Sequence, residues 1–202
     1  AKVALITGCS TGIGRKLALQ LNEKGYVVYA GGRRWESVKT LQDLGITPLE
    51  LDVGNTDQCN EAVQQVISRH GRIDVLVNNA GVGVMGPLID LDDQQIAEQL
   101  SVNVHSVLRM ARAVAPHMIA QRGGLIVNIG SVSGVLVTPF SGIYGASKAA
   151  VHILSDALRM ELAPFNINVM TVQPGAIQSD FGKNAAHSIA GRHRRSSWYS
   201  PI

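Results

Sequence analysis

Six short apolar stretches alternate with helix-length amphipathic stretches along most of this chain. The apolar stretches lie at residues 3–7, 26–30, 47–51, 75–78, 125–129 and 167–172. They mostly lack polar alternation, which is typical of strands buried on both faces of a parallel sheet. Helical spacing is found between them, at residues 14–24, 35–44, 56–70, 92–120 and 144–163. Because right-handed crossovers join parallel strands, this order predicts one α/β domain with a doubly wound, three-layer sheet.

Turn-forming residues support these boundaries. Gly25, Gly45 and Gly71 follow the first three predicted helices, where a residue that tolerates positive φ is useful. Pro164 follows the last predicted helix as a stop, and Asp92 with Asp93 supplies negative charge at the start of the long fourth one.

Composition excludes several classes of protein. The chain has 202 residues, of which 46% are hydrophobic, 4% aromatic and 16% charged, unlike disordered, collagen-like or coiled-coil sequences. A chain of this size can bury a core without disulfide bonds or structural metal ions, so Cys9 and Cys59 are interpreted as reduced thiols. Reduced thiols in turn predict a cytoplasmic location. The six scattered histidines predict no metal site.

Neither a membrane span nor a nucleic-acid surface is predicted. The longest apolar stretch, residues 125–137, is short and is interrupted by Asn128 and Ser131, and residues 2–6 already resemble a strand, not a signal peptide. The net charge of +3 is uneven, because residues 181–202 carry +4 and the rest of the chain −1. This tail is the one basic segment, which is weak support for nucleic-acid binding.

A glycine-rich loop follows the first predicted strand. Residues 7–14 read Thr-Gly-Cys-Ser-Thr-Gly-Ile-Gly and lead into a helix, so the loop fits a pyrophosphate at a helix N-terminus, as in dinucleotide-binding Rossmann folds. The candidate contacts are Gly8, Ser10, Thr11, Gly12, Ile13 and Gly14. The alternatives are a turn without ligand and, for Ser10 or Thr11, a helix cap.

An arginine pair ends the second predicted strand. Arg33 and Arg34 stand where an NAD-selective domain places an acid, and guanidinium groups pair well with a 2′-phosphate, so NADP(H) is the predicted cofactor. The alternative is a solvated arginine pair. Asp52, after the third strand, either accepts from the adenine amino group or caps residues 55–57.

A phenol and an ammonium group share one helix face. Tyr144 and Lys148 are four residues apart, and a nearby cation stabilises phenolate, so we expect Lys148 to lower the pKa of Tyr144 toward the working pH. Tyr26, Tyr29 and Tyr199 lack such a lysine and are interpreted as packing residues.

The sequence resembles the short-chain dehydrogenase/reductase superfamily over residues 1 to about 180. The matching motifs are residues 7–14, residues 78–81 (Asn-Asn-Ala-Gly), Asn103, Ser131, Tyr144 with Lys148, and Pro174 with Gly175. The gap of 13 residues between Ser131 and Tyr144 suits the family and favours Ser131 over Ser133. A carbonyl reductase, or alcohol dehydrogenase, is therefore expected.

The resemblance implies a role for each residue. Tyr144 would be the general acid or base, Ser131 would polarise the carbonyl, Lys148 would hold the nicotinamide ribose, and Asn103 would support a water that links Lys148 to solvent. Further cofactor contacts would be Val53, Asn79, Ala80, Gly81, Pro174, Gly175 and Ile177, beside those named above. Taken singly, Asn103 could also be a polar helix residue whose hydrogen bonds are satisfied locally, and residues 79–81 could be a turn without a cofactor role.

The closest patterns within the superfamily are NADPH-dependent 1-acyldihydroxyacetone-phosphate reductases and the 17β-hydroxysteroid and retinol dehydrogenase types. Both handle lipophilic carbonyls. Residues 135–140, with Met85 and Phe181, either line an apolar substrate cleft or belong to the core. Rival interpretations are an NADP-binding regulator without turnover and a sugar-nucleotide epimerase or dehydratase. The full catalytic set argues against the regulator, and the absence of a substrate domain argues against the epimerase or dehydratase.

The end of the chain gives further expectations. Residues 181–202 are predicted to form a basic loop or substrate flap, whose Lys183, Arg192, Arg194 and Arg195 bind a lipid phosphate, contact anionic membrane lipids, or are merely solvated. The family pattern usually continues past this point, so the sequence is expected to lack a C-terminal part and one usual contact of a homo-oligomer.

Overall fold

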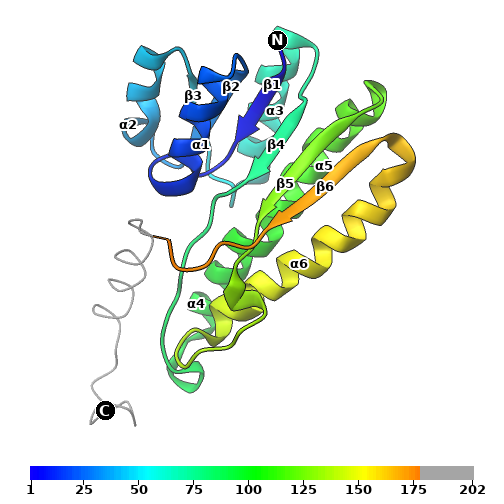
Figure 1. Ribbon diagram of the computed structural model, residues 1–202. Helices are drawn as coiled ribbons and strands as arrows, with labels where there is room; N and C mark the ends of the chain where they lie inside the picture. Colours follow the sequence, from blue (N-terminus) through cyan, green and yellow to red (C-terminus); the bar gives the residue numbers. More distant parts are fainter. Residues whose placement is uncertain (178–202) are drawn as a thin grey trace.

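Six parallel strands form one sheet in the order β3-β2-β1-β4-β5-β6 in the computed structural model, which describes residues 1–177 (Figure 1). The strands are β1 (Val3–Ile6), β2 (Val27–Gly32), β3 (Thr47–Glu50), β4 (Val75–Asn78), β5 (Gly124–Ile129) and β6 (Ile167–Val172). The order reverses between β1 and β4, so ligands are expected outside the carboxyl ends of these two strands.

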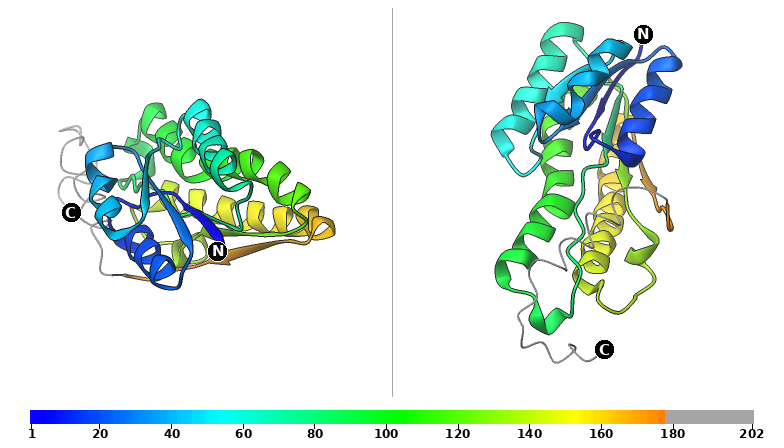
Figure 2. Two further views of the ribbon diagram at one scale, coloured as in Figure 1. Left: turned by 90° about the horizontal axis from the view of Figure 1, so that it is seen from above. Right: turned by 90° about the vertical axis from the view of Figure 1, so that its left-hand side faces the viewer.

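Helices cover both faces of the sheet, which confirms the predicted Rossmann fold in a single domain. They are α1 (Gly12–Glu23), α2 (Trp35–Val38), α3 (Thr56–His70), α4 (Asp93–Leu100), α5 (Ser106–Ala120) and α6 (Gly142–Leu162). Figure 2 shows the helices on both sides of the sheet. One core cluster joins the sheet to α3, α5 and α6, and a second joins it to α1 and α2.

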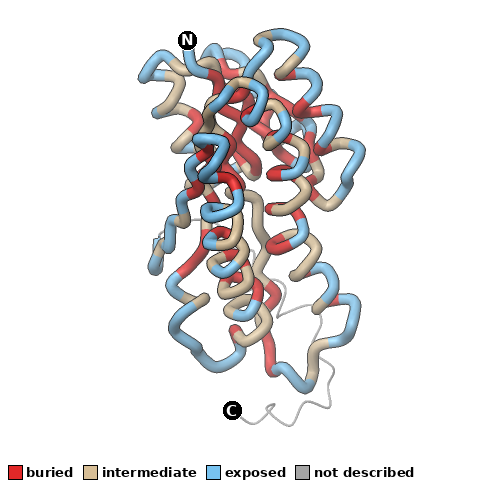
Figure 3. The backbone as a smooth tube through the Cα atoms, turned by 90° about the vertical axis from the view of Figure 1, so that its right-hand side faces the viewer, coloured by how far each residue is buried: buried red, intermediate tan, exposed pale blue. Residues whose placement is uncertain are grey.

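The central strands carry the core. Every residue of β1 is buried, whereas in β6 only Ile167 and Val169 are, and Met170 is 52% exposed (Figure 3). The prediction of strands buried on both faces therefore holds for β1, β2 and β4 but is wrong for β6, because one of its faces is not covered by described residues.

Three predicted helices differ in detail. Residues 35–44 form one α-turn and then a 3-10 helix, Lys39–Leu44. Residues 92–120 are α4 and α5 joined by a π-helical segment, Ser101–His105, which contains Asn103. The N-terminus of α6 lies at Gly142, before the predicted start, since Ser141 occupies the N-cap.

The predicted helix ends are confirmed. Gly25, Gly45 and Gly71 all have φ between 68° and 80°, the left-handed region that favours glycine. Asp92 accepts from the backbone N–H of Gln95 and forms a capping box with it. Cys9 and Cys59 are both buried free thiols, and within residues 1–177 no helix is both long and apolar enough to cross a bilayer.

Candidate active site

The glycine loop and the segment after β4 form one braced unit. Asn79 donates through Nδ2 to the carbonyls of Thr7, at 3.0 Å, and Gly8, at 2.9 Å. In return, Thr7 Oγ1 accepts from the backbone N–H groups of Asn79 and Ala80, at 3.1 and 3.0 Å. Residues 79–81 are therefore more than a plain turn, because they fix the position of the loop that precedes α1.

Glycine is required in this loop for close approach. Gly8 has a φ of 71°, and a Cβ there would lie 2.7 Å from Cα of Ala80. At Gly14, a Cβ would overlap Nδ2 of Asn79. A side chain introduced at either position would push the loop away from residues 79–81. Gly8 and Gly14 are therefore needed for the packing of these two segments as well as for the turn.

The N-terminus of α1 is not capped by its predicted residues. Thr11 stands at the N-cap without a side-chain hydrogen bond, and the first turn contains no acid. Ser10 instead shares a 2.8 Å hydrogen bond with Ser37. The amide groups of Gly12 and Ile13 thus begin a helix whose positive end carries no side-chain cap.

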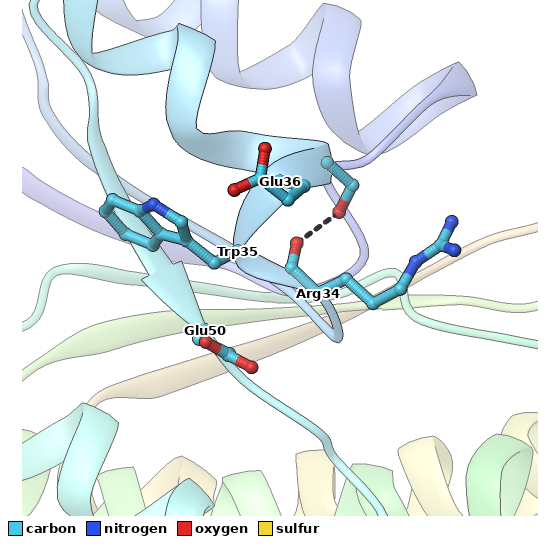
Figure 4. Close-up of a pocket in the computed structure, with 5 residues that line it drawn as sticks. Arg34, Trp35, Glu36 and Glu50 are labelled. Atoms are coloured by element: carbon cyan, nitrogen blue, oxygen red, sulfur yellow. Dashed lines mark hydrogen bonds between the residues drawn. The ribbon is translucent and has the colours of Figure 1, made fainter.

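The arginine pair lies at the end of β2. Arg33 and Arg34 are exposed, and the Arg34 carbonyl accepts from Ser37 Oγ at 2.6 Å. A pocket of about 510 Å³ is lined by Arg34 but not by Arg33, and Figure 4 shows the Arg34 guanidinium extending away from the Trp35 indole, with Glu36 and Glu50 on other sides. This pocket lies at the β3 edge of the sheet and is separate from Tyr144.

Asp52 has a local structural role. Its Oδ1 accepts from the backbone N–H of Gly54 at 2.8 Å. The prediction that it caps residues 55–57 is wrong, because Asn55 caps α3 by accepting from the N–H groups of Asp57 and Gln58. The neighbouring Val53 is buried, and its carbonyl accepts from Arg109 at 3.2 Å. Arg109 was not singled out in the sequence.

Ser131, Tyr144 and Lys148 are brought together at the carboxyl end of β5. Ser131 follows this strand and is hydrogen-bonded through its side chain to that of Tyr144. Lys148, one turn further along α6, is buried and donates through Nζ to the Ile129 carbonyl at 2.7 Å. Burial lowers the pKa of Lys148 to about 8.

The expected lowering of the Tyr144 pKa by Lys148 is not found. Burial raises the pKa of Tyr144 above 10.0, and the hydrogen bond with Ser131 offsets only part of that rise. Nζ of Lys148 lies over the Tyr144 ring, 5.9 Å from its centre, while it is directed at the Ile129 carbonyl. Tyr144 is consequently a protonated phenol at neutral pH in this structure.

Asn103 belongs to a buried polar network. Its Oδ1 accepts from Val82 N at 2.8 Å, and its Nδ2 donates to the Val82 carbonyl and to Ser147 Oγ, both at 3.0 Å. Gln99, one turn earlier and fully buried, accepts from Val84 N at 2.6 Å and donates to the same carbonyl of Val82 at 2.8 Å. Sequence reasoning missed Gln99, although its spacing of four residues from Asn103 on one helix face was a visible signal.

The segment after β6 lies beside Ser131. The carbonyl of Pro174 accepts from the backbone N–H of Val132 at 3.1 Å, while Gly175 and Ile177 are exposed. Phe181, Lys183 and the predicted flap of residues 181–202 lie outside the described residues.

Residues 135–140 are not part of the core. Val135 and Leu136 are each 66% exposed, Val137 is 86% exposed, and Phe140 is 45% exposed. Of the two interpretations of this segment, the core is therefore excluded. Leu88 and Ile89, from the loop after β4, are also exposed apolar residues.

Comparison with known proteins places the chain in a family. Residues 2–190 match the short chain dehydrogenase family, and the chain belongs to it. It is 41% identical over 184 residues to a 3-ketodihydrosphingosine reductase from Bacteroides thetaiotaomicron, covering 91% of this chain and 66% of that protein. It is 38% identical over 180 residues to an NADPH-dependent 1-acyldihydroxyacetone phosphate reductase from Schizosaccharomyces pombe, covering 88% and 60%.

A solved structure supports the same assignment. A gluconate 5-dehydrogenase from Burkholderia cenocepacia, in complex with NADP and tartrate, superposes with a TM-score of 0.85 at 33% identity, covering 91% of this chain and 74% of that one. The chain spans 60 to 66% of the length of the two curated relatives named above.

Proposed function

We propose that the protein is an NADPH-dependent reductase that transfers hydride to the ketone of a lipophilic substrate, such as an acyl-dihydroxyacetone phosphate. The observation that carries the proposal is the hydrogen-bonded pair of Ser131 and Tyr144 with the buried ammonium of Lys148 one helical turn away. The reverse reaction, oxidation of an alcohol, would use the same groups.

The chemistry of these side chains suits carbonyl reduction. NADPH would supply the hydride to the carbonyl carbon. Tyr144, whose raised pKa keeps the phenol protonated, would donate its proton to the substrate oxygen as negative charge develops there. The Ser131 hydroxyl would donate a second hydrogen bond to that oxygen. Lys148 would hold the nicotinamide ribose, and with a pKa of about 8 it can return a proton to Tyr144.

The residues present fit a dinucleotide. The first turn of α1 has no acid and no side-chain cap, which leaves its amide groups for the pyrophosphate. Gly8 and Gly14 allow this loop to pack closely against residues 79–81, and Asn79 braces it by donating to the Gly8 carbonyl. Nζ of Lys148 lies 3.8 Å from where a Cβ of Gly81 would stand, so Gly81 would lie close to the nicotinamide ribose that Lys148 is proposed to hold.

The preference for NADPH rests on Arg33 and Arg34. Both are exposed at the end of β2, and that strand itself ends in two glycines with no carboxylate to repel a 2′-phosphate. Of the nearby acids, Glu36 forms an ion pair with Lys39. Glu50, on the neighbouring strand, is exposed to solvent.

A lipophilic substrate is supported by the exposed apolar segment 135–140, which lies between Ser131 and Tyr144 in the sequence. Both curated relatives are named for reduction of a lipid ketone. The cytoplasmic location, the homo-oligomer and the contacts of the basic segment 181–202 remain predictions from the sequence.

The test follows absorbance at 340 nm with NADPH or NADH and a panel of ketones: an acyl-dihydroxyacetone phosphate, a long-chain 3-keto sphingoid base, a steroid, retinal and a small water-soluble ketone. We expect turnover of a long-chain ketone with NADPH. In the Arg33→Ala, Arg34→Ala double variant, KM for NADPH should rise at least tenfold, while KM for NADH stays unchanged. Binding of NADPH without turnover of any ketone or alcohol would favour the regulator, and equal KM for both cofactors would contradict the NADPH preference.

The substrate class has its own matched pair of variants. Leu136→Ser should raise KM for a long-chain ketone and leave a small ketone unaffected, because only the long chain reaches segment 135–140. Leu44→Ser, at a residue that is 50% exposed next to α2, should change neither. If Leu136→Ser and Leu44→Ser gave the same KM for the long-chain ketone, segment 135–140 would not bind it.

A further inference from the structure

His152 contacts the backbone of Ser131, the residue proposed to polarise the carbonyl. Its Nε2 is 3.3 Å from the backbone nitrogen of Ser131 and accepts that N–H. A backbone N–H can only donate, so Nε2 carries a lone pair and the imidazole is neutral in this arrangement. The hydrogen bond joins α6 to the turn at the end of β5, across 21 residues of sequence.

Two glycines make room for the imidazole. A Cβ at Gly130 would overlap the ring and lie 2.7 Å from its Cδ2, and a Cβ at Gly134 would lie 2.6 Å from its Cε1. These glycines flank Ser131 on both sides in the sequence. The half-buried ring thus packs closely against Gly130 and Gly134, in the backbone segment that carries Ser131.

Ser131 is held at three points. Its N–H is bound by His152, its Oγ accepts from the N–H of Ser133 at 3.1 Å, and its side chain is hydrogen-bonded to Tyr144. The next residue, Val132, donates its N–H to the Pro174 carbonyl. Of these contacts, the one with His152 is broken by adding a proton, since imidazolium has no acceptor nitrogen.

We propose that His152 is a positioning residue: the neutral imidazole holds the backbone of Ser131 so that the hydroxyl stays beside Tyr144, and protonation of His152 releases it and slows carbonyl reduction in acid. This role rests on the proposed reductase activity. It predicts a loss of kcat on the acid side that Tyr144 cannot cause, because a phenol with a raised pKa stays protonated throughout that range.

The charges around the ring agree with a neutral imidazole. Burial and the positive charge of Lys148 lower the pKa of His152 below 6.5, and Asp156, one turn later on α6, acts weakly in the opposite direction. Asp156 is itself paired with Arg159 at 2.8 Å. Within the described part of the chain, the neighbouring segment 130–134 carries no ionisable group.

The kinetic test compares kcat from pH 5 to pH 8 in three variants. His152→Gln keeps an acceptor that does not titrate, so kcat near pH 7.5 should stay close to wild type and the acid-side loss should disappear. His152→Leu leaves the Ser131 N–H without its partner, so kcat near pH 7.5 should fall about tenfold with KM for NADPH unchanged, and this deficit should shrink in acid, where wild type loses the same hydrogen bond. His117→Gln, on α5, which packs against β4 and β5, should keep the wild-type profile.

A second measurement separates this inference from the proposed function. In the protein labelled with ¹⁵N-serine, the amide resonance of Ser131 should titrate with a midpoint below 6.5, together with the His152 ring, and should be flat in His152→Gln. This result would stand even if no ketone were reduced. A Ser131 amide insensitive to pH, an acid-side loss that persists in His152→Gln, or an unchanged kcat in His152→Leu would each overturn the positioning role.

Discussion

Nζ of Lys148 lies 5.9 Å from the centre of the Tyr144 ring and donates a 2.7 Å hydrogen bond to the carbonyl of Ile129. The ammonium is therefore turned toward the end of β5, and the phenol is held by Ser131. Burial acts on both groups in the direction that favours their neutral forms: it raises the pKa of Tyr144 and lowers that of Lys148 to about 8.

Replacing Lys148 by methionine should stabilise the fold while abolishing turnover. Lys148 has a pKa of about 8 in the fold against 10.5 as the ordinary value, a gap worth about 3 kcal/mol at neutral pH. Because the unfolded chain binds more protons between these values, wild-type stability should rise as pH increases from about 8 to 10.5. In Lys148→Met that rise should be absent, and at pH 7 unfolding should cost about 1–3 kcal/mol more than in wild type.

Urea unfolding at pH 7 and pH 10 measures both effects. Lys16→Met, at an exposed lysine of α1, is the matched control and should leave stability unchanged at both pH values. A Lys148→Met protein less stable than wild type at pH 7 would show that burial of the Lys148 ammonium does not destabilise the fold.

Two glycines with the same backbone conformation should tolerate alanine very differently. Gly8 has a φ of 71° and Gly71 a φ of 68°, but a Cβ at Gly8 would lie 2.7 Å from Cα of Ala80, whereas a Cβ at Gly71 has nothing within 4 Å. Gly71→Ala should cost about 1–2 kcal/mol for the left-handed conformation alone. Gly8→Ala should cost clearly more and should also abolish NADPH binding, because the loop must move off residues 79–81.

Thermal unfolding and a fluorescence titration with NADPH check this pair. Similar losses of stability in the two variants, with NADPH affinity retained in Gly8→Ala, would mean that close packing against Ala80 does not shape the loop.

Gln99 should be essential to the segment after β4. Gln99→Leu leaves the N–H of Val84 without its 2.6 Å partner and removes one donor from the Val82 carbonyl, so we expect a loss of about 2–4 kcal/mol. Gln64→Leu, at an exposed position of α3, should change stability by less than about 0.5 kcal/mol. Chemical denaturation compares the two, and equal stabilities would show that the buried amide contributes nothing.

The sequence was sufficient for the architecture because the signal for it is local. Continuous apolar stretches mark β1, β2 and β4, and Gly45 and Gly71 mark helix ends at the residues where the backbone turns left-handed. The glycine loop, Ser131, Tyr144 and Lys148 were found because their spacing along the chain matches a family pattern.

The remaining features depend on contacts between distant segments. Gln99 reaches a backbone 15 residues away and His152 one that is 21 residues away. The spacing of Gln99 from Asn103 marks a shared helix face, but it does not indicate which backbone either Gln99 or His152 binds. The direction of the Tyr144 pKa depends on how deeply the phenol is buried and on where Nζ of Lys148 is directed, which spacing does not determine. The π-helical segment at Asn103 likewise has no signature that distinguishes it from the α-helix around it.

The central claim is that the phenol of Tyr144 delivers the proton in carbonyl reduction. The most direct test is kcat for NADPH-dependent reduction of a long-chain ketone in wild type and in Tyr144→Phe, with the Kd for NADPH measured in both. We predict a fall in kcat of about 100- to 10,000-fold in Tyr144→Phe, with NADPH affinity unchanged. A Tyr144→Phe protein that keeps kcat within a few-fold of wild type would contradict the account.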